Sequence, residues 1–197
     1  MLEKTVAKEL HLVEYSKEES VSRDMILFAK DCHYEYLYRL LSRELAELLK
    51  ASLDTPERYL VTFVPRSRRK EAEHGVDQAR EMAKRIAKAL SADFACCLKH
   101  CHTAEQKGLS LSERKKNTAA SYSLIEKKAS CFEGRSVILY DDVVTTGATL
   151  AACAKLLKKA GAKKVVVLTY GKTYRHETKE KTPILKSKGV GYGKRNE

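Results

Sequence analysis

The sequence predicts an α/β fold in which helices flank a doubly wound, mostly parallel sheet. Apolar runs at 59–64, 137–140 and 163–170 are rich in β-branched and aromatic residues, as buried strands are. Segments 78–90 and 150–160 place their apolar residues at helical spacing. Strands that alternate with amphipathic helices favour parallel βαβ units, so we expect helices on both faces of one sheet.

The remaining elements are weaker in the sequence. Segment 25–49 fits one or two amphipathic helices, while 94–98 and 122–125 fit short strands. Residues 1–21 give no assignable element. We therefore divide the chain into an N-terminal helical segment (1–57), a core (58–170) and a Lys-rich tail that we expect to be flexible (171–197).

The composition suits a soluble globular protein. The chain has 197 residues, of which 43% are hydrophobic and 32% charged. It contains no apolar run long enough for a membrane span or a signal peptide, so we expect a cytoplasmic protein without membrane contact. The six cysteines show no regular framework, which favours free thiols. The net charge of +12 favours polyanions or pyrophosphate-bearing small molecules as partners.

One segment carries most of the chemistry. Asp141 and Asp142 follow the strand 137–140 and begin a loop that leads into the helix starting at Leu150. A helix N-terminus binds anions, and Gly147 lets the backbone approach a ligand closely. Carboxylates accept hydrogen bonds from ribose hydroxyls or lie near a metal-bound ligand, so the loop fits a sugar phosphate. The structural alternative is that Asp and Thr serve here only as strand-end and helix-capping residues.

Two basic segments add to this picture. The run 66–70 (RSRRK) directly follows the strand 59–64, at a position where open α/β sheets bind ligands. We interpret it as a phosphate or pyrophosphate site, with a solvated charge run as the alternative. Segment 106–117 is polar and basic, and we expect it to act as a lid. His74 lies near the first basic run and is a further candidate for a phosphate contact.

Other chemistries have less support. Cys96, Cys97, His100, Cys101 and His102 are metal-ligand types, but their spacing is poor for a tetrahedral site. Buried cysteines and surface histidines are the simpler interpretation. The chain has neither a Gly-x-x-x-x-Gly-Lys motif nor a Gly-x-Gly-x-x-Gly fingerprint, which argues against a P-loop NTPase or a Rossmann dehydrogenase.

Segment 137–149 resembles the phosphoribosyl-pyrophosphate (PRPP) signature of type I phosphoribosyltransferases. The chain is also similar to the ComF family of competence-associated proteins over about residues 25–170. Three segments carry this second resemblance: 64–79 with its Val-Pro, basic run and Asp-Gln-Ala, 106–117 (QKGLSLSERKKN), and 141–149. Val76 and Asp77 replace the Phe and Asn usual in that family. No CxxC pair occurs, so we expect this chain to lack the family's N-terminal zinc module.

The resemblance implies a type I phosphoribosyltransferase fold with a small N-terminal hood, and it implies roles for individual residues. Asp141 and Asp142 would hold the ribose hydroxyls, and Arg114 or Lys115 would approach the leaving group when the lid closes. The pyrophosphate would face Arg66, Ser67, Arg68 and Arg69. The 5′-phosphate would lie against Thr145, Thr146, Gly147, Ala148 and Thr149. The expected cofactor is Mg²⁺, carried by PRPP and not by a metal site of the protein.

Two functions remain open at this level. The first is a glycosyltransferase of nucleotide metabolism, a Mg²⁺-dependent phosphoribosyltransferase that transfers the phosphoribosyl group to an unidentified nucleobase or amine. The second is a non-catalytic PRPP-binding protein of competence or DNA processing, whose basic surface contacts nucleic acid. The net charge of +12 favours the second more than the first. Both leave a homodimer open.

Overall fold

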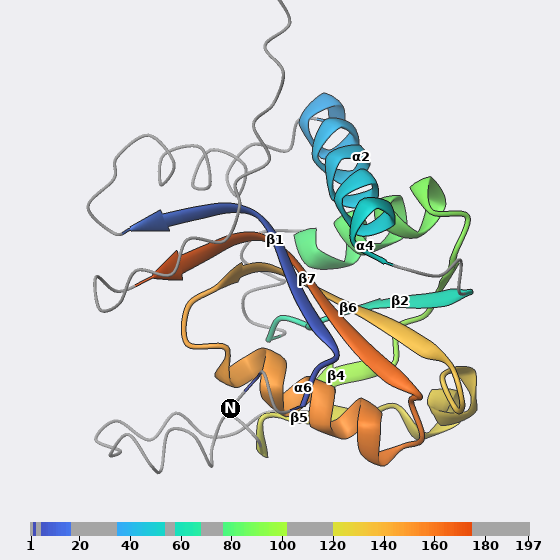
Figure 1. The fold of residues 1–197 in the computed structure, drawn as a ribbon. Helices are drawn as coiled ribbons and strands as arrows, with labels where there is room; N and C mark the ends of the chain where they lie inside the picture. The colour runs from blue at the N-terminus through green and yellow to red at the C-terminus, as the bar shows by residue number, and fades with distance from the viewer. Residues whose placement is uncertain are drawn as a thin grey trace, which may run out of the picture.

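The computed structural model of the chain describes residues 2, 5–16, 35–53, 58–67, 77–101 and 120–174. In this part of the chain, a sheet of five parallel strands lies between two layers of further elements (Figure 1). The predicted α/β class is confirmed. In chain order the elements are β1 Lys8–Ser16, α2 Glu35–Ser52, β2 Tyr59–Phe63, α4 Gln78–Ala89, β3 Asp93–Phe94, β4 Leu98–His100, β5 Tyr122–Leu124, η1 Glu126–Cys131, β6 Ser136–Val144, α6 Ala148–Lys159 and β7 Lys164–Tyr174.

The strand order β1-β7-β6-β2-β3 places β6 at the centre of the sheet. Because side chains alternate along a strand, β6 serves two cores. Val137 and Leu139 pack on the side of α6, whereas Ile138 and Tyr140 pack on the side of α2 and α4. The apolar strands predicted at 59–64, 137–140 and 163–170 are thus the buried central strands of the sheet.

Helix α4 begins at Gln78, where the sequence predicts it. Asp77 caps α4, since its carboxylate accepts a hydrogen bond from the backbone N–H of Arg80 at 3.2 Å. The buried face of α4 includes Ala79, Met82 and Ile86, which pack against β2 and α2. On the other face of the sheet, α6 packs against β6, β7 and the β4–β5 hairpin. Figure 1 shows α2 and α4 above the sheet and α6 below it.

The predicted strand 94–98 is wrong as a single element. Phe94 ends the edge strand β3, beside β2, and Leu98 begins β4 of a separate antiparallel hairpin. Between them, the backbone N–H of Ala95 still bonds to Val61, while the carbonyl of Cys97 accepts from Ile125. The chain therefore crosses from the sheet to the hairpin within three residues, because each strand has a different partner.

Three boundaries also differ from the sequence-based expectation. Strand β6 continues through Asp141 and Asp142 to Val144, since Val143 and Val144 still pair with β7. The loop that follows is shorter than expected, and α6 begins at Ala148 instead of Leu150. Strand β7 reaches Tyr174, four residues into the segment expected to be a flexible tail.

Strand β1 has no counterpart in the sequence-based assignment. It pairs in parallel with β7 over its whole length and forms the edge of the sheet. The sheet thus includes residues on both sides of the expected 58–170 core. Residues 25–34 of the segment expected to form one or two helices, the lid at 106–117 and the tail from 175 onward lie outside the described residues. Among the described helices, none has the length and apolar character needed to cross a membrane.

Candidate functional site

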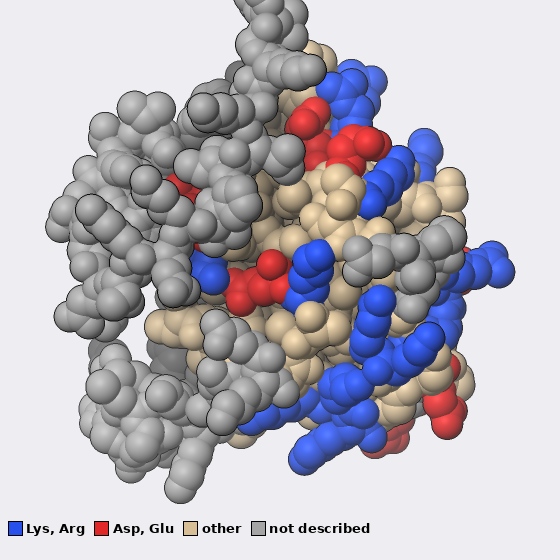
Figure 2. Space-filling view, in the orientation of Figure 1, with Lys and Arg blue, Asp and Glu red and all other residues tan. Residues whose placement is uncertain are grey.

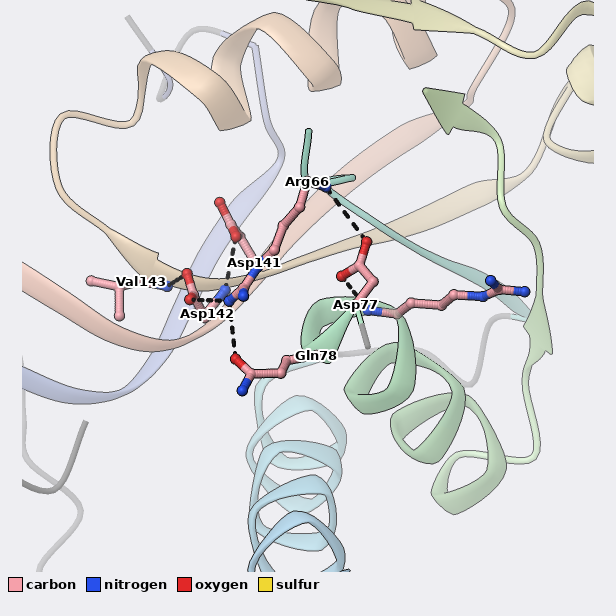
Figure 3. A network of polar contacts seen from close by, with 7 residues as sticks. Arg66, Asp77, Gln78, Asp141, Asp142 and Val143 are labelled. Atoms are coloured by element: carbon pink, nitrogen blue, oxygen red, sulfur yellow. Dashed lines mark hydrogen bonds and ion pairs between the residues drawn. The ribbon is translucent and has the colours of Figure 1, made fainter. Parts of the chain in front are cut away.

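The candidate site lies where β2 and β6 end at the same edge of the sheet. After Phe63, the N–H of Val64 continues the ladder by bonding to the Tyr140 carbonyl at 2.9 Å, and Pro65 is buried. Arg66 then turns its side chain across the strand ends. Its Nη2 lies 3.3 Å from Oδ2 of Asp142 (Figure 3). The side chains are 20% and 28% exposed, so this ion pair is partly shielded from solvent.

Helix α4 supports Arg66 from a second direction. The Arg66 Nη2 also donates to Oε1 of Gln78 at 3.0 Å, and Gln78 is a buried residue of the first turn of α4. The backbone N–H of Arg66 lies 3.5 Å from Oδ2 of Asp77, the residue that caps the same helix. Figure 3 shows Asp77 and Gln78 reaching toward Arg66 from the helix end. One arginine thus links β2, β6 and α4.

The two adjacent acids leave opposite faces of β6. Asp142 is two residues after Tyr140, so its side chain lies on the same face of β6, the α4 side, together with Arg66. Its Oδ1 also accepts a hydrogen bond from the N–H of Val143 at 2.7 Å. Asp141 is two residues after Leu139 and its side chain lies on the α6 side, as Figure 3 shows. Its charge raises the pKa of Tyr122 and Cys153, both in the α6-side core, although burial is the larger cause in each case.

Segment 145–149, which we call the phosphate loop, joins β6 to α6. Thr145 and Thr146 are exposed, and Thr146 Oγ1 accepts from the N–H of Ala148 at 3.4 Å. Gly147 is the N-cap of α6 with φ of 67°, in the left-handed region that side chains disfavour. The loop therefore presents hydroxyls at the N-terminus of a twelve-residue helix, where the helix dipole and first-turn amides favour an anion.

The structure adds polar groups beside Asp141 that the sequence did not single out. Thr169 on β7 is the register partner of both Asp141 and His11 of β1. Within the described part of the chain, Thr169 Oγ1 and His11 Nδ1 are buried and have no hydrogen-bond partner, while His11 Nε2 lies 2.7 Å from a carboxylate oxygen of Glu14. The alternating pattern Leu10, His11, Leu12 was the signal that could have predicted this strand.

The predicted site residues thus fall into two groups. Arg66, Asp141, Asp142 and the phosphate loop lie at one edge of the sheet, and Ser67 is half-buried next to Arg66. Gln78 and Asp77 join them, although the sequence assigned them no role in the site. Arg68, Arg69, His74, Arg114 and Lys115 lie outside the described residues.

The structure gives no support to a metal centre at the cysteines. Within the described residues, no group of three or more His, Cys, Asp or Glu side chains is arranged to hold a metal ion. Cys97 is fully buried, and burial raises the pKa of its thiol to about 11. His102 lies outside the described residues.

A parallel α/β sheet with a helix N-terminus and paired acids at its carboxyl edge is an arrangement in which α/β proteins bind nucleotides or sugar phosphates. The family model described as the phosphoribosyl transferase domain matches residues 74–189, more than half of the chain. The chain belongs to this family. The expected type I phosphoribosyltransferase fold is therefore confirmed.

The ComF resemblance is confirmed over part of the chain. A 66-residue segment is 44% identical to Competence protein F of Haemophilus influenzae and covers 34% of this chain. The match spans 28% of that protein, well under two thirds of its length. This match does not test the expectation that the chain lacks the family's N-terminal zinc module.

Solved structures show likeness at low identity. Glutamine PRPP amidotransferase from B. subtilis is 18% identical with a TM-score of 0.45, covering 66% of this chain and 25% of its own. A hypoxanthine phosphoribosyltransferase from Staphylococcus aureus is 14% identical with a TM-score of 0.43, covering 82% and 84%. A hypothetical protein from Neisseria gonorrhoeae with bound ppGpp is 10% identical with a TM-score of 0.48, covering 76% and 75%.

Proposed function

We propose that the chain binds PRPP at the carboxyl edge of the sheet and transfers its phosphoribosyl group to an acceptor, with release of pyrophosphate. The carrying observation is the Arg66–Asp142 contact of 3.3 Å, beside the phosphate loop. It joins the expected pyrophosphate segment to an expected ribose acid, although the two are 76 residues apart in the chain. Family membership supports the same ligand.

Each group has a part in this proposal. The phosphate loop binds the 5′-phosphate, and Asp141 and Asp142 accept hydrogen bonds from the ribose hydroxyls. Arg66 and Ser67, together with Arg68 and Arg69, face the pyrophosphate. Arg114 or Lys115 approaches the leaving group. These charges favour the transition state, in which negative charge grows on the departing pyrophosphate.

The reaction breaks the bond between C1 of the ribose and the pyrophosphate oxygen, and it forms a bond from C1 to the acceptor. The acceptor nitrogen loses a proton in the same overall step. The acceptor class proposed is a nucleobase or an amine.

Mg²⁺ fits this site as an ion carried by the ligand. The carboxylates at the strand ends provide the oxygen atoms that Mg²⁺ prefers, but they are too few to enclose it. When bound with PRPP, Mg²⁺ neutralises pyrophosphate charge. Removing it with EDTA is therefore expected to abolish tight PRPP binding.

Calorimetry with Mg-PRPP tests the binding proposal. Wild-type protein is expected to bind and Asp142→Asn to bind more weakly, since the variant loses the charge that holds Arg66 and the ribose. Absence of heat with wild-type protein would show that the ligand is wrong. Pyrophosphate release, screened over nucleobases and amines, then tests transfer separately from binding.

A second candidate is a non-catalytic PRPP-binding protein that contacts nucleic acid. One observation favours it: basic side chains gather on one face of the molecule, at the lower right of Figure 2. Six lysines of α6, of the turn after it and of η1 are exposed: Lys127, Lys128, Lys155, Lys158, Lys159 and Lys163. The turn after η1 and the turn after α6 are joined by the hydrogen bond from the N–H of Gly134 to the carbonyl of Gly161.

Salt dependence distinguishes this candidate. Binding to single- or double-stranded DNA is expected to weaken steeply with salt, and Lys155→Gln/Lys158→Gln/Lys159→Gln is expected to reduce that slope. A truncation after Tyr174 leaves β7 intact and tests the basic tail. DNA binding that neither change affects would remove this candidate.

A further inference from the structure

Leu2 lies against the phosphate loop, although it is far from the loop in the sequence and belongs to none of the sequence motifs. A Cβ placed on Gly147 would lie 3.2 Å from Cδ2 of Leu2 and 3.5 Å from its Cβ. Because Gly147 has no side chain, the leucine packs directly against the backbone of the loop. Leu2 is only 7% exposed, so this contact is largely shielded from water.

The residues on either side of the phosphate loop belong to the same buried cluster as Leu2. Val144, the last residue of β6, and Leu150, in the first turn of α6, are both buried, and both are members of the α6-side core. The apolar side chains that anchor the loop therefore come from three segments of the chain: the end of β6, the start of α6 and the N-terminal residue Leu2.

Backbone hydrogen bonds hold Leu2 in this place. The amides of Thr5 and Val6 both donate to the carbonyl of Leu2, at 2.8 Å and 3.2 Å. The N–H of Ala7 then donates to the carbonyl of Val165 at 2.8 Å, directly before β1 begins to pair with β7. Leu2 is thus tethered to the edge of the sheet, and the loop is supported by a segment that precedes β1.

This support matters because an anion site made of backbone amides depends on its shape. Gly147 is the N-cap of α6, and the first amides of a helix have no acceptor within the helix. They converge on one anion only while the loop residues keep their conformations. A loop without support is ordered by its ligand instead, and the lost backbone entropy then weakens binding.

We propose that Leu2 is a positioning residue for the phosphate loop: its side chain holds Gly147 in place, so that the loop is shaped for a 5′-phosphate before the ligand binds. This inference rests on the proposed function, because it assumes that the loop binds the phosphate of a sugar phosphate. It assigns Leu2 to the 5′-phosphate only, since Arg66 and Asp142 lie on the α4 side of β6 and Leu2 lies on the α6 side.

Two ligands separate these halves of the site. The affinities of the full chain for ribose 5-phosphate and for inorganic pyrophosphate are measured by calorimetry. Leu2→Asn introduces a polar side chain of similar size, which is disfavoured in an apolar contact. It is expected to weaken ribose 5-phosphate binding by roughly three- to tenfold, the effect of leaving about one backbone residue for the ligand to order, and to leave pyrophosphate binding unchanged.

Two further variants distinguish positioning from a general loss of stability. Leu2→Met keeps an apolar side chain and is expected to bind ribose 5-phosphate like wild-type protein. Leu53→Asn is the matched control, because Leu53 follows α2 and packs, partly buried, against the core on the other face of the sheet. It is expected to lower the melting temperature and to change neither affinity.

The contact with Gly147 is then tested as a unit. The methyl group of Gly147→Ala crowds Leu2, so adding Leu2→Asn is expected to cost less stability than the two single changes together. Unchanged ribose 5-phosphate affinity in Leu2→Asn, equal losses for both ligands, a comparable loss in Leu53→Asn or strict additivity would overturn the inference. Wild-type protein that binds PRPP but not ribose 5-phosphate would also overturn it, since the loop would then not be shaped in advance. Wild-type protein that binds neither ligand would instead overturn the proposed function.

Discussion

The two faces of β6 give neighbouring carboxylates different surroundings. On the α4 face, Asp142 meets the cation of Arg66, which Gln78 holds in turn. On the α6 face, Asp141 lies near the phenol of Tyr122, the buried thiol of Cys153 and the start of α6. One face therefore offers a side-chain cation and the other a helix N-terminus with hydroxyls. Adjacent acids can thus serve different parts of one ligand.

The largest expected effect is on the α6 face. Gly147→Ala places a side chain on a left-handed residue and only 3.2 Å from Leu2, so both strain and crowding oppose it. We expect the free energy of unfolding to fall by about 1–2 kcal/mol from the backbone strain. We expect ribose 5-phosphate binding to fall at least tenfold, while pyrophosphate binding changes less.

Gly134 provides the matched control for this variant. It has nearly the same φ of 66°, but a Cβ there would meet no atom within 4 Å. Gly134→Ala is expected to lower the melting temperature through strain alone and to leave ligand affinity intact. Comparable losses of affinity in the two alanine variants would show that ligand binding does not depend on the shape of the phosphate loop.

The next effect belongs to the α4 face. Arg66→Lys keeps the positive charge but cannot bridge Asp142 and Gln78 in the same way, because an ammonium lacks the planar guanidinium fork. Loss of one charge-assisted contact is expected to weaken pyrophosphate binding by roughly tenfold. Ribose 5-phosphate is the internal comparison, and a larger loss for that ligand would contradict the division of the site between faces.

A smaller effect is expected from the support of Arg66. Gln78→Leu has a similar volume and removes the acceptor that lies 3.0 Å from the guanidinium. We expect pyrophosphate binding to weaken by roughly threefold, because Arg66 loses a supporting acceptor but keeps its contact with Asp142. Gln78→Glu restores an acceptor and serves as the control. If both variants bind like wild-type protein, Gln78 has no positioning role.

The last prediction concerns the dependence of stability on pH and not ligand affinity. Burial raises the pKa of the Cys97 thiol from about 9 to about 11 on the α6 face. Above pH 9 the unfolded chain releases this proton while the folded chain retains it, so stability is expected to fall as pH rises from 9 to 11. Urea unfolding across this range measures the slope. Cys97→Ala is expected to flatten it, whereas Cys131→Ala, at an exposed position, is expected to leave it unchanged.

Much of the fold and part of the site could be predicted from local patterns. The central strands are continuous apolar runs, and the apolar residues of α4 and α6 have helical spacing. Each of these elements can therefore be recognised from a dozen residues or fewer. The acids, the phosphate loop and Arg66 could be predicted because they follow these strands directly. The edge strand β1 was missed because its alternation is short and mixed with charges.

The sequence by itself determined the order of the central strands β2, β6 and β7 with α4 and α6, and the chemistry of the loop after β6. Only the tertiary structure decided how far β6 runs, because Val143 and Val144 extend the strand by pairing with β7. That extension places Asp141 and Asp142 on opposite faces. The contacts of Arg66 with Gln78 and Asp142 likewise join segments distant in the chain. Such contacts depend on how strands pair and helices pack, which no local pattern of residues specifies.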